Sequence, residues 1–232
     1  RERMLPLSEA LEITPELLRA LDRDEISAAG ARIKFGVMLG DGDLTVPALG
    51  YGVEPAIEKA IMKLNKRIIE GGYLEDQDRA VILGRDLARR LGKKVGDTLT
   101  IITRTAYDSP TGMNLVVKGI YSTGLGGIDR SVFYVPIEKA RELLDLDGRA
   151  TEIVIFLLDR DQAAAVARSL RHEFPGLSVT SYLENPLLKQ VNVNESVFMV
   201  FYFIILMVAC SAIANTMLMV VFERQREIGM LK

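Results

Sequence analysis

The stretch VFMVFYFIILMVACSAIANTMLMVVF, from Val197 to Phe222, decides how this chain is organised. It contains no charged residue, and roughly 26 helical residues at about 1.5 Å each reach about 39 Å, more than the ~30 Å hydrocarbon thickness of a bilayer. The alternative is a buried helix of a soluble core, but such helices usually keep a polar stripe and seldom stay uncharged beyond about 14 residues. The stretch therefore predicts a single transmembrane helix.

A few small and polar side chains interrupt the apolar run. Ser211 and Asn215 lie four positions apart, with Ala212 beside them, so all three share one helical face. Such a face is suited to close packing and hydrogen bonding against another membrane helix. The alternative for Ser and Thr is a hydrogen bond back to a carbonyl group of their own helix. We expect neighbouring membrane helices at this face.

The charge changes abruptly after the span, in Glu223-Arg-Gln-Arg-Glu-Ile-Gly-Met-Leu-Lys232. Positive charge is more frequent on this side than on the other, where Lys189 stands alone, and positive charge near a span marks the cytoplasmic side. We therefore expect the carboxyl end in the cytoplasm and residues 1–196 outside it, at the cell (inner) membrane. Because no export signal precedes this large outer part, we expect a fragment whose flanking membrane helices are absent, rather than a tail-anchored protein.

Composition and motifs argue against several function classes. The formal net charge is −2, whereas nucleic-acid binding needs a strongly basic face. Cys210 is the only cysteine, so no intrachain disulfide can form. The only histidine, His172, lies near a predicted helix end, where the helix dipole favours it, and supports neither a multi-histidine metal site nor a Ser-His-Asp triad. The glycine-rich segment 119–127 lacks the lysine of a phosphate-binding loop, so we expect a mobile turn there. We expect no enzyme, cofactor or metal site.

The first part of the polar region predicts a small α/β lobe. Thr14 is a candidate N-cap for a short helix that begins at Pro15. Residues 32–39 alternate polar and apolar, which predicts a strand, and a turn at 41–43 leads to a second strand and a helix over 54–64. Near the other end of the lobe we expect strands at 151–158 and 177–180, with a helix over 161–172 that Asp161 caps.

Between these segments the sequence pattern changes to short predicted strands separated by turn residues. We expect strands at 81–84, 98–103, 115–121 and 131–135, with helices at 85–91 and 136–144. The predicted fold is therefore an α+β extracytoplasmic domain over 1–188, namely an α/β sandwich lobe (1–69 and 149–188) with an inserted β-rich lobe (70–148). A helix over 189–222 then enters and spans the membrane, and 223–232 begins a cytoplasmic coupling segment.

Several phrases of the sequence resemble one known family. Glu223–Lys232 after a membrane helix is similar to the coupling segment of MacB/FtsX-type ABC transporter permeases, which include lipoprotein-releasing LolC and LolE permeases. Their extracytoplasmic core domain is similar to this chain in four phrases that occur in the family's order: Val81–Gly92, Val95–Thr100, Val117–Gly124 and Asp129–Pro136.

The resemblance implies a permease subunit that works as a homo- or heterodimer with a separate cytoplasmic ATPase, whose motion reaches the outer domain mechanically. It implies export or release of lipoprotein or another envelope substrate, with a periplasmic adaptor or lipoprotein carrier as a further partner. The alternatives are a membrane-anchored scaffold for cell-wall hydrolases or an envelope adaptor, and a membrane-tethered enzyme, which the missing catalytic constellations disfavour.

The charged segment itself is suited to docking on a partner protein, because both signs of charge adjoin an apolar face. A flank that merely contacts lipid headgroups would favour basic residues over the two glutamates. The residues expected to dock on the ATPase are Glu223, Arg224, Arg226, Glu227, Ile228, Gly229 and Leu231.

Overall fold

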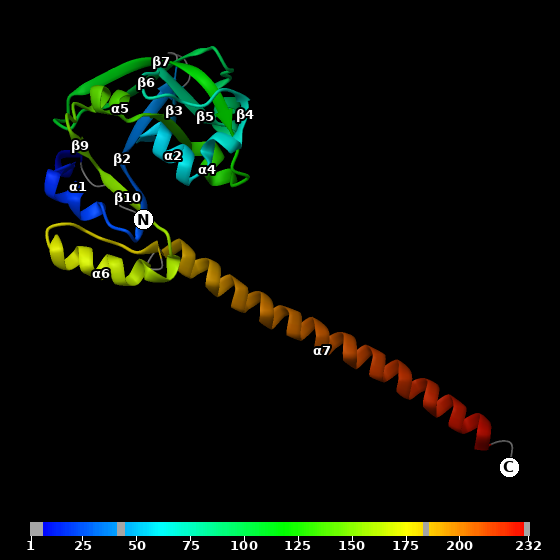
Figure 1. Cartoon of the computed structure of the whole chain (residues 1–232). Coiled ribbons are helices and arrows are strands. Elements are labelled where there is room, and N and C mark those ends of the chain that lie inside the picture. Colours follow the sequence, from blue (N-terminus) through cyan, green and yellow to red (C-terminus); the bar gives the residue numbers. More distant parts are fainter. Residues whose placement is uncertain (1–6, 41–44, 183–185, 230–232) are drawn as a thin grey trace. The chain divides into compact units, whose positions relative to one another are not determined.

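The structure is a computed structural model that describes residues 7–40, 45–182 and 186–229, with side chains in the last helix described from 198 to 222 and at 224. It divides into two compact units, residues 1–160 and 161–232. The first unit is a mixed α/β domain and the second contains a long apolar helix (Figure 1).

The first unit alternates strands with short helices. Its helical elements are η1 (Leu7–Glu9), α1 (Pro15–Leu21), α2 (Pro55–Ile61), η2 (Leu64–Arg67), α3 (Arg85–Leu91), α4 (Gly126–Ser131), α5 (Ile137–Leu144) and the start of η3 (Arg160–Gln162). Its strands are β1 (Leu11–Glu12), β2 (Ile26–Gly40), β3 (Thr45–Val53), β4 (Ile68–Gly71), β5 (Ala80–Gly84), β6 (Thr98–Arg104), β7 (Pro110–Tyr121), β8 (Val132–Pro136), β9 (Arg149–Ala150) and β10 (Glu152–Leu157).

Six strands form a barrel-like sheet, in the order β2, β3, β8, β5, β7 and β6. The ring closes because β6 pairs on one side with β7 and on the other with the end of β2, where Met38 lies opposite Ile102. Strands β4 and β10 attach to this ring through β7 and β2 (Figure 1). A sheet that closes on itself buries one continuous core.

The core follows the alternation of the strands. The predicted inward face of β2 is confirmed, because Ile33, Phe35, Val37 and Leu39 are all buried. Gly50 of β3 lies opposite Phe35 of β2. A Cβ atom added at Gly50 would come within 2.6 Å of the Phe35 ring and 2.7 Å of the Phe133 ring. Those two rings pack edge to face with their centroids 6.0 Å apart, so the absence of a side chain at Gly50 makes room for them.

The expected sandwich with an inserted lobe is corrected to a single barrel-like sheet. Strands β2 and β3 belong to the predicted α/β lobe, whereas β5, β6, β7 and β8 belong to the predicted β-rich segment. The structure joins them, since β3 runs parallel to β8 and β6 pairs with β2. At fifteen residues, β2 is long enough to pair with three strands, which explains the single sheet.

Most local predictions are confirmed, including the β2–β3 hairpin, α2, α3, α5 and the Thr14 cap, which accepts a hydrogen bond from the Leu17 amide at 3.3 Å. The turn at 41–43 lies outside the described residues. The predicted turn at 119–127 is partly wrong, since β7 continues to Tyr121 and α4 begins at Gly126.

The second unit contains the rest of η3, then α6 (Ala163–Glu173) and α7 (Pro186–Gly229). The predicted Asp161 cap is wrong, because Asp161 lies in η3 and Gln162 holds the cap position. The predicted strand at 177–180 is also wrong. There the Val179 carbonyl accepts a hydrogen bond from Arg171 Nε at 2.7 Å, so a side chain rather than a strand partner satisfies it.

Candidate functional site

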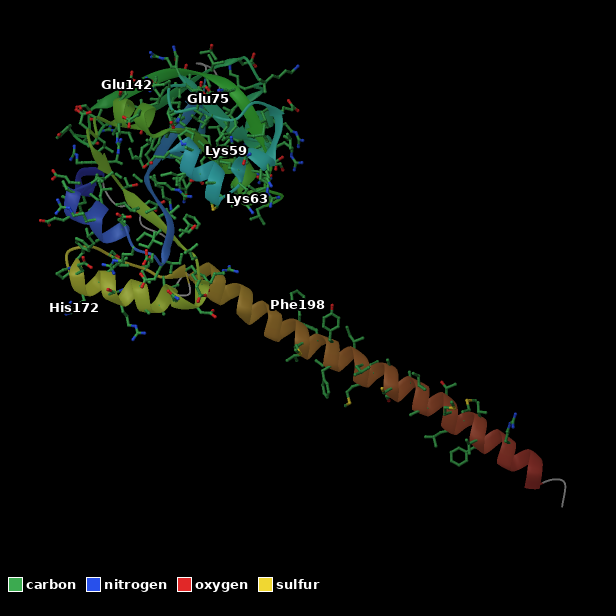
Figure 2. The ribbon with its side chains drawn as sticks, in the orientation of Figure 1. Lys59, Lys63, Glu75, Glu142, His172 and Phe198 are labelled. Carbon is green, nitrogen blue, oxygen red and sulfur yellow. The ribbon has the colours of Figure 1, made fainter. Side chains whose placement is uncertain are left out.

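The long helix α7 includes a candidate membrane span, Phe198–Phe222, with mean hydropathy 2.3. Its apolar side chains project outward along the helix from Phe198 onward, and every one of them is exposed (Figure 2). Exposed apolar side chains over 25 residues are stable in lipid and unfavourable in water. The predicted span thus lies within one uninterrupted helix that is long and apolar enough to cross a membrane.

The small polar face of α7 lies near the middle of this span. Ser211, Ala212 and Asn215 are all exposed on the helix. Thr216, one position further, donates its hydroxyl hydrogen to the Ala212 carbonyl oxygen at 2.9 Å. This is the back-bonding that sequence reasoning left open, and it satisfies the Thr216 hydroxyl within its own helix. Packing of Ser211, Ala212 and Asn215 against another helix stays a prediction.

The predicted docking residues follow on the same helix. Its backbone continues without a break to Gly229, so Glu223, Arg224, Arg226, Glu227 and Ile228 extend the span as one helix. Arg224 is exposed; the side chains of the other docking residues, like Leu231 as a whole, lie outside the described part. Because an unbroken helix is a stiff rod, displacement of this segment would also displace the span.

The four phrases that carry the family resemblance come together in the barrel. They form β5 with α3, the start of β6, the end of β7, and α4 with β8. Strand β5 lies between β7 and β8; it runs parallel to β7 and antiparallel to β8. Gly84, at the end of β5, lies so close to the Asp129 backbone that no Cβ would fit. The phrases therefore describe one packed centre rather than separate surface motifs.

Asp129 organises the glycine-rich segment. Its carboxylate accepts hydrogen bonds from Ser122 Oγ (2.7 Å), the Thr123 amide (2.8 Å) and hydroxyl (2.7 Å), and the Gly124 amide (3.4 Å). Asp129 has no exposed surface. Its burial alone would raise the pKa, but the hydrogen bonds outweigh it and hold the pKa of Asp129 below its ordinary value. Sequence reasoning missed this role, although an Asp soon after a Ser-Thr-Gly turn is a usable signal.

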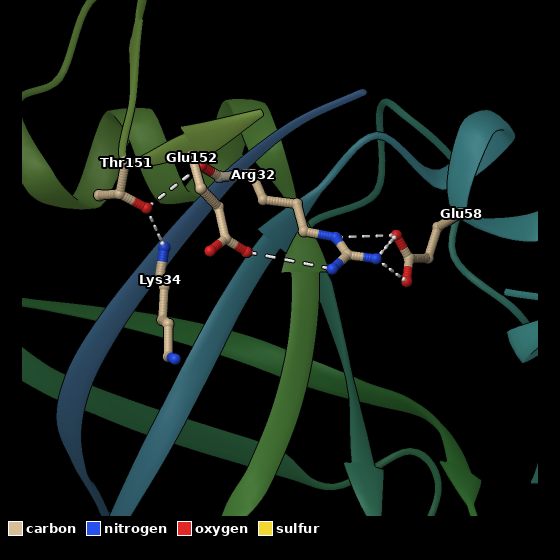
Figure 3. A network of polar contacts seen from close by, with 5 residues as sticks. All are labelled: Arg32, Lys34, Glu58, Thr151 and Glu152. Atoms are coloured by element: carbon tan, nitrogen blue, oxygen red, sulfur yellow. Dashed lines mark hydrogen bonds and ion pairs between the residues drawn. The ribbon is translucent and has the colours of Figure 1, made fainter. Parts of the chain in front are cut away.

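A second polar cluster, also missed from the sequence, joins β2 to α2. The Arg32 guanidinium donates to both oxygens of the Glu58 carboxylate, from Nη2 at 2.8 and 2.9 Å and from Nε at 3.2 Å (Figure 3). Only 15% of the Arg32 side chain and 6% of the Glu58 side chain are exposed. Glu152 of β10 lies 4.0 Å from Arg32 Nη1. We call Arg32 and Glu58 the clasp.

His172 is exposed in the last turn of α6, as expected from its sequence position (Figure 2). Among the described residues, no three or more His, Cys, Asp or Glu side chains form a group that could hold a metal ion.

Sequence comparison with known proteins finds several relatives of this chain. Over 223 residues the chain is 25% identical to the lipoprotein-releasing system transmembrane protein LolC of Xylella fastidiosa (strain 9a5c), covering 92% of this chain and 54% of that protein. It is 26% identical to LolC of Neisseria meningitidis over 192 residues, covering 78% and 46%. LolE of Haemophilus influenzae is 21% identical over 227 residues, covering 92% and 54%. The chain thus spans about half the length of these relatives.

Two solved structures share the fold. The extracellular domain of the noncanonic ABC-type transporter YknZ from Gram-positive bacteria superposes with a TM-score of 0.52 at 16% identity, covering 75% of this chain and 88% of that one. The periplasmic region of MacB from Actinobacillus actinomycetemcomitans gives a TM-score of 0.50 at 14% identity, covering 70% and 74%.

A family model covers most of the chain. Residues 5–173 match the MacB-like periplasmic core domain, a domain of ABC permeases and not of a catalytic enzyme family. The match includes all strands of the barrel, and the candidate span follows it in the sequence. The chain therefore belongs to the MacB-like periplasmic core domain family of ABC permeases.

Proposed function

We propose that this chain is part of a permease subunit that transmits the motion of a separate cytoplasmic ABC ATPase to an extracytoplasmic domain. The observation that carries the proposal is the unbroken helix α7, in which a 25-residue apolar span leads directly into a charged segment. The family assignment supports it, because the matched domain is a periplasmic one. Residues 1–196 then lie outside the cytoplasm and the carboxyl end inside.

The proposed ATPase-docking segment comprises Glu223, Arg224, Arg226, Glu227, Ile228, Gly229 and Leu231. Its charges of both signs select a partner surface that carries both signs, while Ile228 and Leu231 supply apolar anchors. Because residues 223–229 continue the helix of the span, a push on them from the ATPase is delivered to the membrane helix as a whole.

Ser211, Ala212 and Asn215 form the proposed contact with further membrane helices, including those of a second permease subunit. Small residues permit close backbone approach in lipid, and the Asn215 amide provides an interhelical hydrogen bond. The proposed cargo is a lipoprotein or another envelope substrate, since the relatives found in sequence comparison are lipoprotein-releasing proteins. A periplasmic adaptor or lipoprotein carrier would receive it.

The test is co-purification of the full-length permease with its ATPase. Arg224→Glu and Glu227→Arg each place a like charge against the partner, so we expect each to reduce ATPase retention at least tenfold. Arg168→Glu makes the same change on the exposed face of α6, in the outer part of the chain, and we expect it to leave retention unchanged. Equal retention in all three variants would refute docking through this segment.

A further inference from the structure

The strand β2 changes partners at Arg32. It pairs with β10 from Ile26 to Arg32 and with β3 from Arg32 to Gly40. We call the β2–β10 pair the ribbon; it leads away from the barrel towards α1 (Figure 1). A two-stranded pair is only marginally stable by itself and twists readily, so the backbone ladder alone does not fix the direction of the ribbon.

The clasp lies at the base of this ribbon. The fork of the Arg32 guanidinium meets the Glu58 carboxylate through two nitrogen atoms, an arrangement that fixes orientation as well as distance. Since Glu58 belongs to α2, the clasp joins β2 to an element outside the ladder. Gly30 permits this approach, because an added Cβ there would lie 2.9 Å from Ile57 Cγ2 of α2.

Side chains also hold the backbone on both sides of β2 at this junction. Glu54, just before α2, accepts a hydrogen bond from the Ala31 amide at 3.0 Å, one residue beyond the end of the β3 ladder. Thr151, just before β10, accepts one from the Lys34 amide at 2.7 Å and donates one to the Arg32 carbonyl at 3.2 Å (Figure 3). At the end of each ladder, the backbone groups of β2 are therefore hydrogen-bonded to a side chain instead of being left without a partner.

We propose that Arg32 is a positioning residue, whose ion pair with Glu58 holds the ribbon at one fixed angle to the barrel. Displacement that arrives along β10 is then passed to the barrel without bending at the junction. The inference rests on the proposed function, in which force reaches β10 through the following chain of α6 and α7. The ion pair itself is a property of the first unit alone, so it can be tested without an ATPase.

The experiment measures the angle of the ribbon by distances between pairs of spin labels. The full chain, with Cys210→Ser to remove its own thiol, is placed in lipid nanodiscs. One label pair, Ser27→Cys with Ile102→Cys, joins exposed sites on the ribbon and on β6. The second pair, Ile69→Cys with Ile102→Cys, joins two strands attached to β7 and reports on the barrel. Both pairs are measured by pulsed electron resonance.

We expect one narrow distance distribution for each pair in the parent chain. Arg32→Gln and Glu58→Gln should each broaden the ribbon–barrel distribution at least twofold and leave the barrel distribution narrow. Arg32→Lys keeps the charge but loses the fork, so we expect an intermediate width. The control Lys139→Gln, which removes the ion pair with Glu142 within α5, should change neither distribution.

Two results would overturn the inference: an unchanged ribbon–barrel distribution in Arg32→Gln, or equal broadening of both distributions, which would mean general loosening of the domain. Because no ATPase is present, failure of the docking proposal would not alter this measurement, and failure of the clasp would not alter ATPase retention.

Discussion

The apolar side chains of the barrel are buried within the domain, whereas those of the helix α7 are exposed. In the barrel, alternation sends every second side chain of β2 inward, and the core is complete within the domain. In α7, the apolar side chains from Phe198 to Phe222 are exposed on all sides, which suits them to lipid and, as proposed above, to other membrane helices. The difference teaches where mutations act: barrel changes should alter the stability of this chain, whereas α7 changes should alter its assembly.

The largest expected effect tests the barrel side of that comparison at the clasp. Glu58→Ala leaves the Arg32 guanidinium largely buried without its carboxylate, which should destabilise the domain by about 3–5 kcal/mol. Glu138→Ala breaks an ion pair whose Glu138 side chain is 61% exposed, and should cost only about 0.5 kcal/mol. Urea unfolding of the full chain, followed by tyrosine circular dichroism, measures both. Similar losses in the two variants would contradict the burial argument.

The next effect depends on pH. Asp129→Asn replaces a carboxylate that accepts four hydrogen bonds, and should cost about 2 kcal/mol at pH 7. Because the folded-state pKa of Asp129 is lowered, its contribution is complete above the unfolded value of about 3.9 and disappears as pH falls through the folded value. Unfolding from pH 7 to pH 2 should show the two proteins converging below about pH 4. A gap that widens in acid would contradict this sign.

A smaller barrel effect concerns packing. Gly50→Ala forces a methyl group against the rings of Phe35 and Phe133 and should destabilise the domain by about 1–3 kcal/mol. Gly126→Ala adds the same methyl group where no atom lies within 4 Å, so it should be neutral or slightly stabilising. Thermal unfolding distinguishes them, and equal melting temperatures would show that the barrel interior can rearrange around Gly50.

The smallest expected effect tests the α7 side. Asn215→Leu should leave unfolding of the outer domain unchanged but weaken association of membrane helices by about 0.6 kcal/mol, roughly threefold. Thr216→Val should alter neither, because the Thr216 hydroxyl already bonds within its own helix. Energy transfer between labelled full-length subunits in nanodiscs measures association. A larger loss for Thr216→Val than for Asn215→Leu would place the helix contact on another face.

Sequence reasoning succeeded where the signal was local. The alternation of residues 32–39, the cap at Thr14 and the uncharged run of α7 each depend on a few neighbouring side chains, and each element was predicted correctly. It failed where distant strands decide. Nothing near β6 indicates that Ile102 lies opposite Met38, and that pairing turns the expected sandwich into a barrel.

The polar clusters show the same limit. Arg32 and Glu58 are far apart in the sequence, and each alone resembles an ordinary charge on an exposed face. Asp129 has a nearer signal in Ser122 and Thr123, but Gly126 and Gly127 concealed the start of α4. The proposed coupling segment was instead recognised by resemblance, and its role still requires a partner.

The central claim is that the segment after the span contacts a cytoplasmic ATPase. A photo-activated crosslinking residue in place of Arg224, in the full-length permease in intact cells, tests it most directly. We predict a crosslinked product that contains the ABC ATPase, and no such product from the same residue in place of Leu158, which is 73% exposed in the outer domain. The ATPase crosslinked from Leu158, or from neither position, would contradict the account.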